Sequence, residues 1–169
     1  DGRQSMRALK IAACAAVSLL VVTLLLVAYL FLTAQVEIVS VTSTGASLES
    51  DPETFESLRS AVEQETFQGT LFNRPSEWGS AGDYALITYT VRLRNGCLVP
   101  IDMIEAQVVP QSQDILQIGD FQVRSLEAKT EGDITASILT AKNSHAIREV
   151  IVTYYVWGVS FSVRTTYGG

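Results

Sequence analysis

The stretch IAACAAVSLLVVTLLLVAYLFLTA, residues 11–34, decides how the chain is organised, because it contains no charged side chain. A helix of this length rises about 36 Å, and the hydrocarbon core of a bilayer is roughly 30 Å thick. Helices buried inside soluble domains are usually shorter. The stretch therefore predicts one transmembrane helix over residues 11–34, in contact with membrane lipid.

Basic residues flank this stretch on one side only. Arg3, Arg7 and Lys10 precede it, and the next basic residue after it is Arg59. Basic flanks usually remain in the cytoplasm. We therefore expect residues 1–10 to form a basic cytoplasmic tail, and the chain to cross the cell membrane once with its C-terminal domain outside. A cleaved signal peptide is the competing interpretation, but its apolar region is usually only 7–15 residues long.

The remaining residues, 35–169, are enough for one domain with its own core. They carry nine basic and seventeen acidic residues, so their formal net charge is 9 − 17 = −8. A negative surface repels phosphate groups and therefore opposes nucleic-acid binding. We expect an extracytoplasmic domain over residues 35–169 with no nucleic-acid partner.

Most of this domain has the two-residue period of β-strands. The period is clear in residues 84–94 and is densest in residues 150–163, where only Gly158 interrupts it. Turn-forming residues separate such runs at intervals of roughly ten residues, which is typical of antiparallel sandwiches. The sequence predicts a mainly β fold, an immunoglobulin-like antiparallel β-sandwich. A barrel is the structural alternative.

One helix is expected among the strands. Residues 50–53, SDPE, have the Ser, Pro and Glu of a capping box at a helix start. Phe55, Leu58 and Val62 then recur on one helical face. We predict an inserted amphipathic helix over about residues 51–67 whose apolar face caps one edge of a sheet.

The connection that follows, residues 68–82 (QGTLFNRPSEWGSAG), is rich in turn formers. Connections of this length usually bind something or fold back on the domain. Phe72, Arg74 and Trp78 are residue types that dominate binding energy when they are exposed. We take these three as candidate contacts with a protein partner outside the membrane. Packing of Phe72 and Trp78 against the domain is the alternative.

Residues that carry chemistry are sparse. The chain has one histidine, His145, and two cysteines, Cys14 and Cys97, and no nucleotide-binding or hydrolase motif. A nucleophilic pair of Cys97 and His145 has no supporting motif around it. Acidic residues at 114 and 120, and at 131 and 133, fall in expected turns but follow no calcium-binding pattern. We therefore expect no enzymatic activity, no catalytic residues, no cofactor and no metal site.

Several segments carry a resemblance to a known group of domains. They are residues 36–41 (VEIVSV), 90–95 (TVRLRN) followed by 99–101 (VPI), and 154–159 (YYVWGV). With the N-terminal anchor, this layout resembles the membrane-anchored sandwich domains of the late-embryogenesis-abundant type 2 and FxLYD-like groups. Gly96 stands where many of those domains have Pro, and their pattern lacks the inserted helix. The resemblance implies a binding or structural module.

Three hypotheses about function follow. The first is a single-pass, membrane-anchored binding or assembly module, which needs no catalytic residues. The second is a structural subunit of a surface filament or envelope complex, and the third is a hydrolase with an unrecognised site. We favour the first, because an anchor, a sandwich and an unexplained aromatic connection require no missing catalytic residue.

Overall fold

A computed structural model of the protein describes residues 2–33, 35–119, 124–144 and 147–168. The chain forms two compact units, Asp1–Gln35 and Val36–Gly169. The first unit contains helix α1 (Gly2–Leu32), which is long and apolar enough over Met6–Leu32 to cross a membrane. The predicted N-terminal apolar helix is therefore confirmed, and it begins before the apolar stretch.

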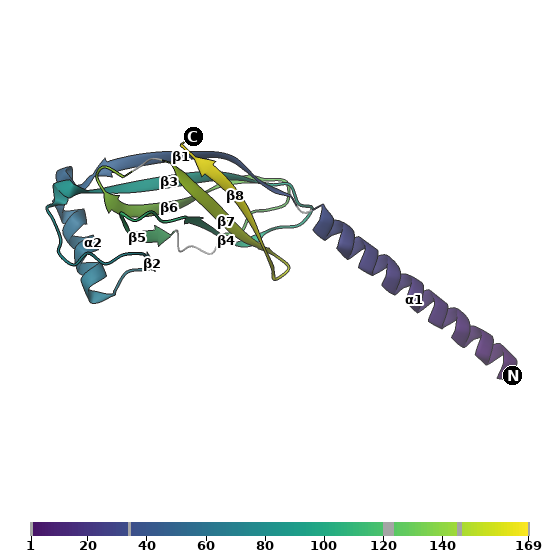
Figure 1. Cartoon of the computed structure of the whole chain (residues 1–169). Helices are drawn as coiled ribbons and strands as arrows, with labels where there is room; N and C mark the ends of the chain where they lie inside the picture. The colour runs from purple at the N-terminus through teal and green to yellow at the C-terminus, as the bar shows by residue number, and fades with distance from the viewer. Residues whose placement is uncertain (1, 34, 120–123, 145–146, 169) are drawn as a thin grey trace. The chain divides into compact units, whose positions relative to one another are not determined.

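The second unit is a sandwich of two antiparallel sheets (Figure 1). One sheet has the order β1-β3-β6-β5-β2 and the other has the order β4-β7-β8. Two separate sheets confirm the predicted mainly β sandwich and rule out the barrel. The strands are β1 (Val36–Ser47), β2 (Gly69–Leu71), β3 (Tyr84–Asn95), β4 (Asp102–Val108), β5 (Asp114–Gly119), β6 (Glu131–Ala141), β7 (Arg148–Val156) and β8 (Val159–Tyr167).

The core lies between the inner faces of the two sheets. Alternate residues of β7, from Arg148 to Val156, are buried, which is the period expected of a strand with one face in a core. Gln117 of β5 also joins the sheets, because its amide accepts from Val108 N (3.0 Å) and donates to the Ala106 carbonyl (3.1 Å). The inner face further contains Val91, Leu93, Ile104, Ile134, Ile138, Val150 and Val152.

Asn95 organises the turn after β3. The buried side chain accepts from the Cys97 backbone N–H at 2.9 Å, and its Nδ2 donates to the carbonyl oxygens of Val99 and Leu126, each at 3.0 Å. These bonds satisfy the backbone groups of two connections at once. An amide side chain is therefore required here.

Gly158 lies in the tight turn between β7 and β8. Both central residues of this turn have positive φ, 49° for Trp157 and 79° for Gly158. Two-residue hairpin turns commonly need positive φ at both of these positions. The interruption expected at Gly158 is therefore a hairpin turn.

The inserted helix α2 (Pro52–Gln64) is confirmed, but its ends differ from the prediction of residues 51–67. Its N-cap is Asp51 rather than Ser50, because Asp51 Oδ1 accepts from Thr54 N at 3.1 Å. The helix stops at Gln64 because Glu65 adopts a left-handed conformation with φ 55°. The predicted C-terminal end of the helix, residue 67, is therefore three residues beyond the observed end at Gln64.

The prediction of a turn around residues 131–133 is wrong, because these residues begin β6. Glu131 pairs with Arg94 across the strands at 2.7 Å, and Asp133 pairs with Arg92 at 2.9 Å. Opposite charges on neighbouring strands support this register. These acids therefore serve strand pairing.

Candidate functional site

Residues 48–83 lie between two strands that pair with each other. β1 and β3 are neighbours in the sheet, and Ser47 at the end of β1 is opposite Ala85 at the start of β3. A turn of two to five residues is enough to join paired strands. We call residues 48–83 the insert; it contains η1 (Leu48–Ser50), α2, β2 and η2 (Ala81–Asp83). It lies at the end of β1 remote from Val36 (Figure 1).

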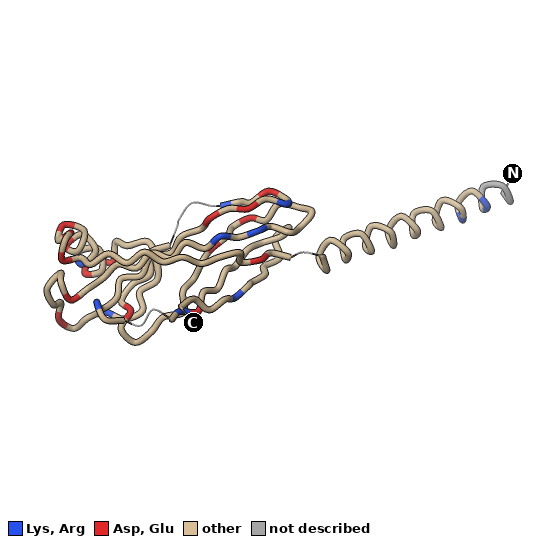
Figure 2. Tube along the Cα trace, turned by 90° about the horizontal axis from the view of Figure 1, so that it is seen from above, with Lys and Arg blue, Asp and Glu red and all other residues tan. Residues whose placement is uncertain are grey.

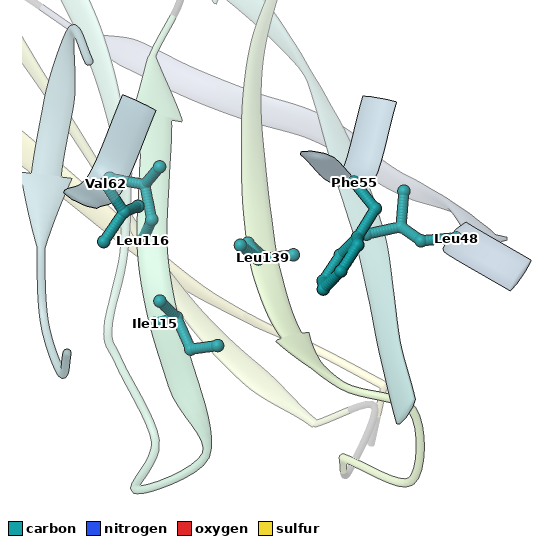
Figure 3. Close-up of a cluster of buried hydrophobic side chains, with 6 residues drawn as sticks. All are labelled: Leu48, Phe55, Val62, Ile115, Leu116 and Leu139. Carbon is teal, nitrogen blue, oxygen red and sulfur yellow. The ribbon is translucent and has the colours of Figure 1, made fainter. Parts of the chain in front are cut away.

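The insert packs on the outer face of the five-stranded sheet. Phe55 and Val62 of α2 belong to one buried cluster with Leu116 of β5 and Leu139 of β6 (Figure 3). Leu139 lies on the opposite face of β6 from its buried neighbour Ile138. Both faces of the sheet are thus covered here. The apolar stripe of the helix packs into a core as expected, but on the outer face of the sheet rather than at its edge.

Trp78 is half-buried within an aromatic group. Its ring lies 6.0 Å from that of Phe55 in an edge-on arrangement and 5.6 Å from that of Tyr84. The Tyr84 hydroxyl also accepts a hydrogen bond from Gly79 N at 3.0 Å. Trp78 therefore holds the connection against α2 and β3 with part of its surface still exposed.

Arg74 and Phe72 lie beside the C-terminal end of α2 and along the sheet edge. The exposed Arg74 guanidinium donates to Glu65 at 2.8 Å and to the Val62 carbonyl at 3.3 Å. A cation favours this position because helix C-terminal carbonyls carry partial negative charge. The half-buried Phe72 donates its backbone N–H to Ile115 O at 2.8 Å, which extends the β2–β5 pairing by one residue.

The outward surface of the insert is acidic. Residues 48–83 contain eight acids and two basic residues, a net charge of 2 − 8 = −6 out of the −8 of residues 35–169. Figure 2 shows acidic positions at the end of the sandwich that carries α2, and further acidic positions beside basic ones toward the other end. The exposed acids of the helix itself are Glu53, Glu56 and Glu63. The three predicted contact residues thus share a segment with most of the net negative charge of the domain.

The carboxylate of Asp51, at the start of α2, has a shifted pKa. Hydrogen bonds from the Thr54 hydroxyl and then from the Thr54 backbone N–H lower the pKa of Asp51 below its usual 3.8. The carboxylate therefore remains charged at the N-terminus of α2, where the helix dipole also favours an anion. Its role is to hold the helix start.

The other candidates for chemistry in the sequence were Cys97, His145 and the acidic residues. Cys97 is buried, and His145 lies outside the described residues. Asp114, which the sequence placed in a turn, instead begins β5 and is buried against Arg148 of β7 at 3.0 Å. Among the described residues, no group of three or more His, Cys, Asp or Glu is arranged to hold a metal ion.

Sequence reasoning missed a second surface, at the end of the sandwich where β1 begins. Leu98, Met103, Trp157 and Val159 are all exposed there. Strand periodicity assigned Trp157 and Val159 to the two faces of strands, and only the turn geometry places them at a tip. The motif Trp-Gly at an expected break was the available signal.

No family model matches the chain, and no curated protein matches its sequence. Among solved structures, the crystal structure of a FixG-related protein from Vibrio parahaemolyticus is similar over 59% of this chain and 93% of that chain. The sequence identity is 14% and the TM-score is 0.34. Similarity at this level supports no inference about the present chain.

Proposed function

We propose that the chain is a single-pass, membrane-anchored binding module without catalytic activity. In this proposal residues 11–34 cross the cell membrane, residues 1–10 stay in the cytoplasm and the sandwich lies outside. The length and hydropathy of α1 support the span, and the basic residues before it support the orientation. The insert then contacts a protein partner.

The size and position of the insert carry this proposal. A connection of 36 residues replaces a turn that two to five residues can make, and its helix packs on a sheet already buried on its other face. Long ordered connections on a rigid scaffold are commonly the functional part of a domain. β1 holds the insert roughly 35–40 Å from Val36, given about 3.3 Å per strand residue.

The charge of the insert defines the chemistry of the partner. A surface that carries −6 of net charge attracts a basic surface and repels an acidic one. The exposed face of α2 supplies the central acids, and Arg74 and Phe72 flank its C-terminal end. Trp78 contributes through its exposed part and by holding the connection in place.

Two variants of equal charge test the proposal. The first changes Glu53, Glu56 and Glu63 on the insert to Gln, and the control changes Glu37, Glu105 and Glu127 outside it to Gln. All six side chains are exposed, so both variants should fold. The full chain is purified from its own membranes in detergent, and the proteins that accompany it are quantified at several salt concentrations.

We expect the insert variant to lose the accompanying protein and the control to retain it, with salt weakening the wild-type association. Equal recovery with both variants would show that the insert is not the contact. Recovery of further copies of the same chain alone would favour a structural subunit instead.

A further inference from the structure

The exposed apolar side chains of the second unit gather at one end. Among its described residues, six large apolar side chains are exposed, and five of them lie near the start of β1. The sixth, Ile147, precedes β7 at the opposite end of that strand. We call the five the apolar end: Val39 (41% exposed), Leu98 (55%), Met103 (57%), Trp157 (55%) and Val159 (48%).

Strand pairing brings these residues to the same end. Val36, the first residue of β1, is opposite Asn95, and Leu98 lies in the turn that Asn95 organises. Met103 follows Asp102, which is opposite Tyr155, two residues before Trp157. The Tyr154 hydroxyl hydrogen-bonds the backbone of Val36 and therefore ties the β7–β8 turn to the start of β1.

Two of these side chains occupy unfavourable backbone positions. Trp157 has φ 49° and Met103 has φ 50°, in the left-handed region that is unfavourable for a residue with a side chain. Asn or Gly is preferred at the first central position of such a hairpin turn. Trp157 is more than half exposed at this position and so leaves apolar surface available for a contact outside the domain.

The short connection between α1 and β1 limits how far the apolar end can lie from the membrane. Only residues 33–35 separate Leu32 at the end of α1 from Val36, so the two Cα atoms lie within about 15 Å of each other, at 3.8 Å per residue. The headgroup layer on each side of a bilayer is roughly 5–8 Å thick. Whatever angle the units adopt, the start of β1 lies at or just above this layer when α1 spans the membrane.

We infer that the apolar end rests in the headgroup layer of the bilayer that α1 crosses, with Trp157 as its main anchor. This inference rests on the proposed membrane anchoring. Trp suits the layer because its ring is apolar and its indole N–H is polar, and Leu, Met and Val remove further apolar surface from water. The insert lies at the other end of β1 from these residues.

The two tryptophans of the chain provide a matched test. The variant Trp78→Phe leaves Trp157 as the reporter at the apolar end, and Trp157→Phe leaves Trp78 as the reporter at the insert. Each full-length variant is reconstituted into phosphatidylcholine vesicles, with ordinary or with brominated acyl chains. Flotation after an alkaline wash first shows whether the protein is embedded.

We expect brominated lipid to quench most of the Trp157 emission and to leave Trp78 emission unchanged. Embedded protein with unquenched Trp157 would overturn the inference and leave anchoring intact, whereas protein removed by the wash would refute the anchoring itself. Should Trp78→Phe fail to fold, the difference in quenching between wild type and Trp157→Phe gives the quenching of Trp157 by brominated lipid. A Trp157 signal shielded from both lipid and water would instead indicate a protein cover.

Discussion

Replacing Asp114 by Asn should destabilise the sandwich strongly. Asp114 and Arg148 have no exposed side-chain surface, and Asp114 Oδ1 lies 3.0 Å from Arg148 Nη2. The pair joins the two sheets, because β5 belongs to one and β7 to the other. Asn keeps the shape but removes the negative charge, which leaves the guanidinium buried without this counter-charge. Breaking a buried pair in this way costs about 3–5 kcal/mol.

The change is measured by urea unfolding of the full chain in a non-ionic detergent, followed by tryptophan fluorescence. A loss of about 4 kcal/mol with a slope of about 2 kcal/mol per molar urea lowers the midpoint by roughly 2 M. The matched control is Asp133→Asn, which removes the same charge from an exposed pair with Arg92. Exposed pairs contribute little, so its midpoint should stay close to that of the wild type.

Equal midpoints for Asp114→Asn and Asp133→Asn would show that the buried pair stabilises the sandwich no more than the exposed one. A second comparison uses the double variant Asp114→Leu with Arg148→Met, which removes both charges and keeps apolar volume. Replacing a buried pair by packed apolar residues is often nearly neutral. The double variant should therefore be more stable than Asp114→Asn alone.

Three other predictions follow from the insert and the anchor. Trp78→Ala should lower the free energy of unfolding by about 2–3 kcal/mol, because contacts with Phe55 and Tyr84 are lost. This loss is smaller than that expected for truncating a fully buried Trp. An unchanged thermal midpoint would contradict the prediction. Asp51→Ala should lower the thermal midpoint at pH 7, where the depressed pKa of Asp51 favours the folded state. This difference should shrink as the pH falls below 3.8 through the lowered folded pKa, and a difference that stays as large in acid as at pH 7 would contradict the assignment. Protease added to intact cells should remove the sandwich, and protection until lysis would refute the outward orientation.

The period of the sequence predicted the elements well. Residues 11–34 could only form a long apolar helix, and the alternation in residues 150–163 fixed β7 and β8 with a break at Gly158. Both signals are local, because each depends on side chains that are near one another along the chain. Local patterns therefore sufficed for the element type of these two stretches.

The structure differed where distant residues decide the outcome. Asp114 and Arg148 are 34 positions apart, and nothing near either residue shows that they meet in the core. The N-cap moved from Ser50 to Asp51 because the two candidates are adjacent and only the geometry of Thr54 distinguishes them. The acids at 131 and 133 resembled a turn around Gly132 until their partners on β3 were known.

The candidate contact residues were identified by type alone. Phe72, Arg74 and Trp78 share one segment, as the sequence requires, but only the fold shows that Trp78 packs on Phe55 whereas Arg74 stays exposed. The number of acidic residues beside them could be counted in the sequence. Their concentration at one end depends on the insert folding over the end of β1.

Site-specific photo-crosslinking in intact cells tests most directly whether the insert contacts a partner. A photoreactive amino acid is placed at Glu56 on the exposed face of α2, and the control places it at the exposed Thr42 on β1. The account predicts a discrete crosslinked protein with a basic surface from position 56 and none from position 42. Crosslinks from position 42 alone, or from neither position while the control protein folds and reaches the membrane, would contradict it.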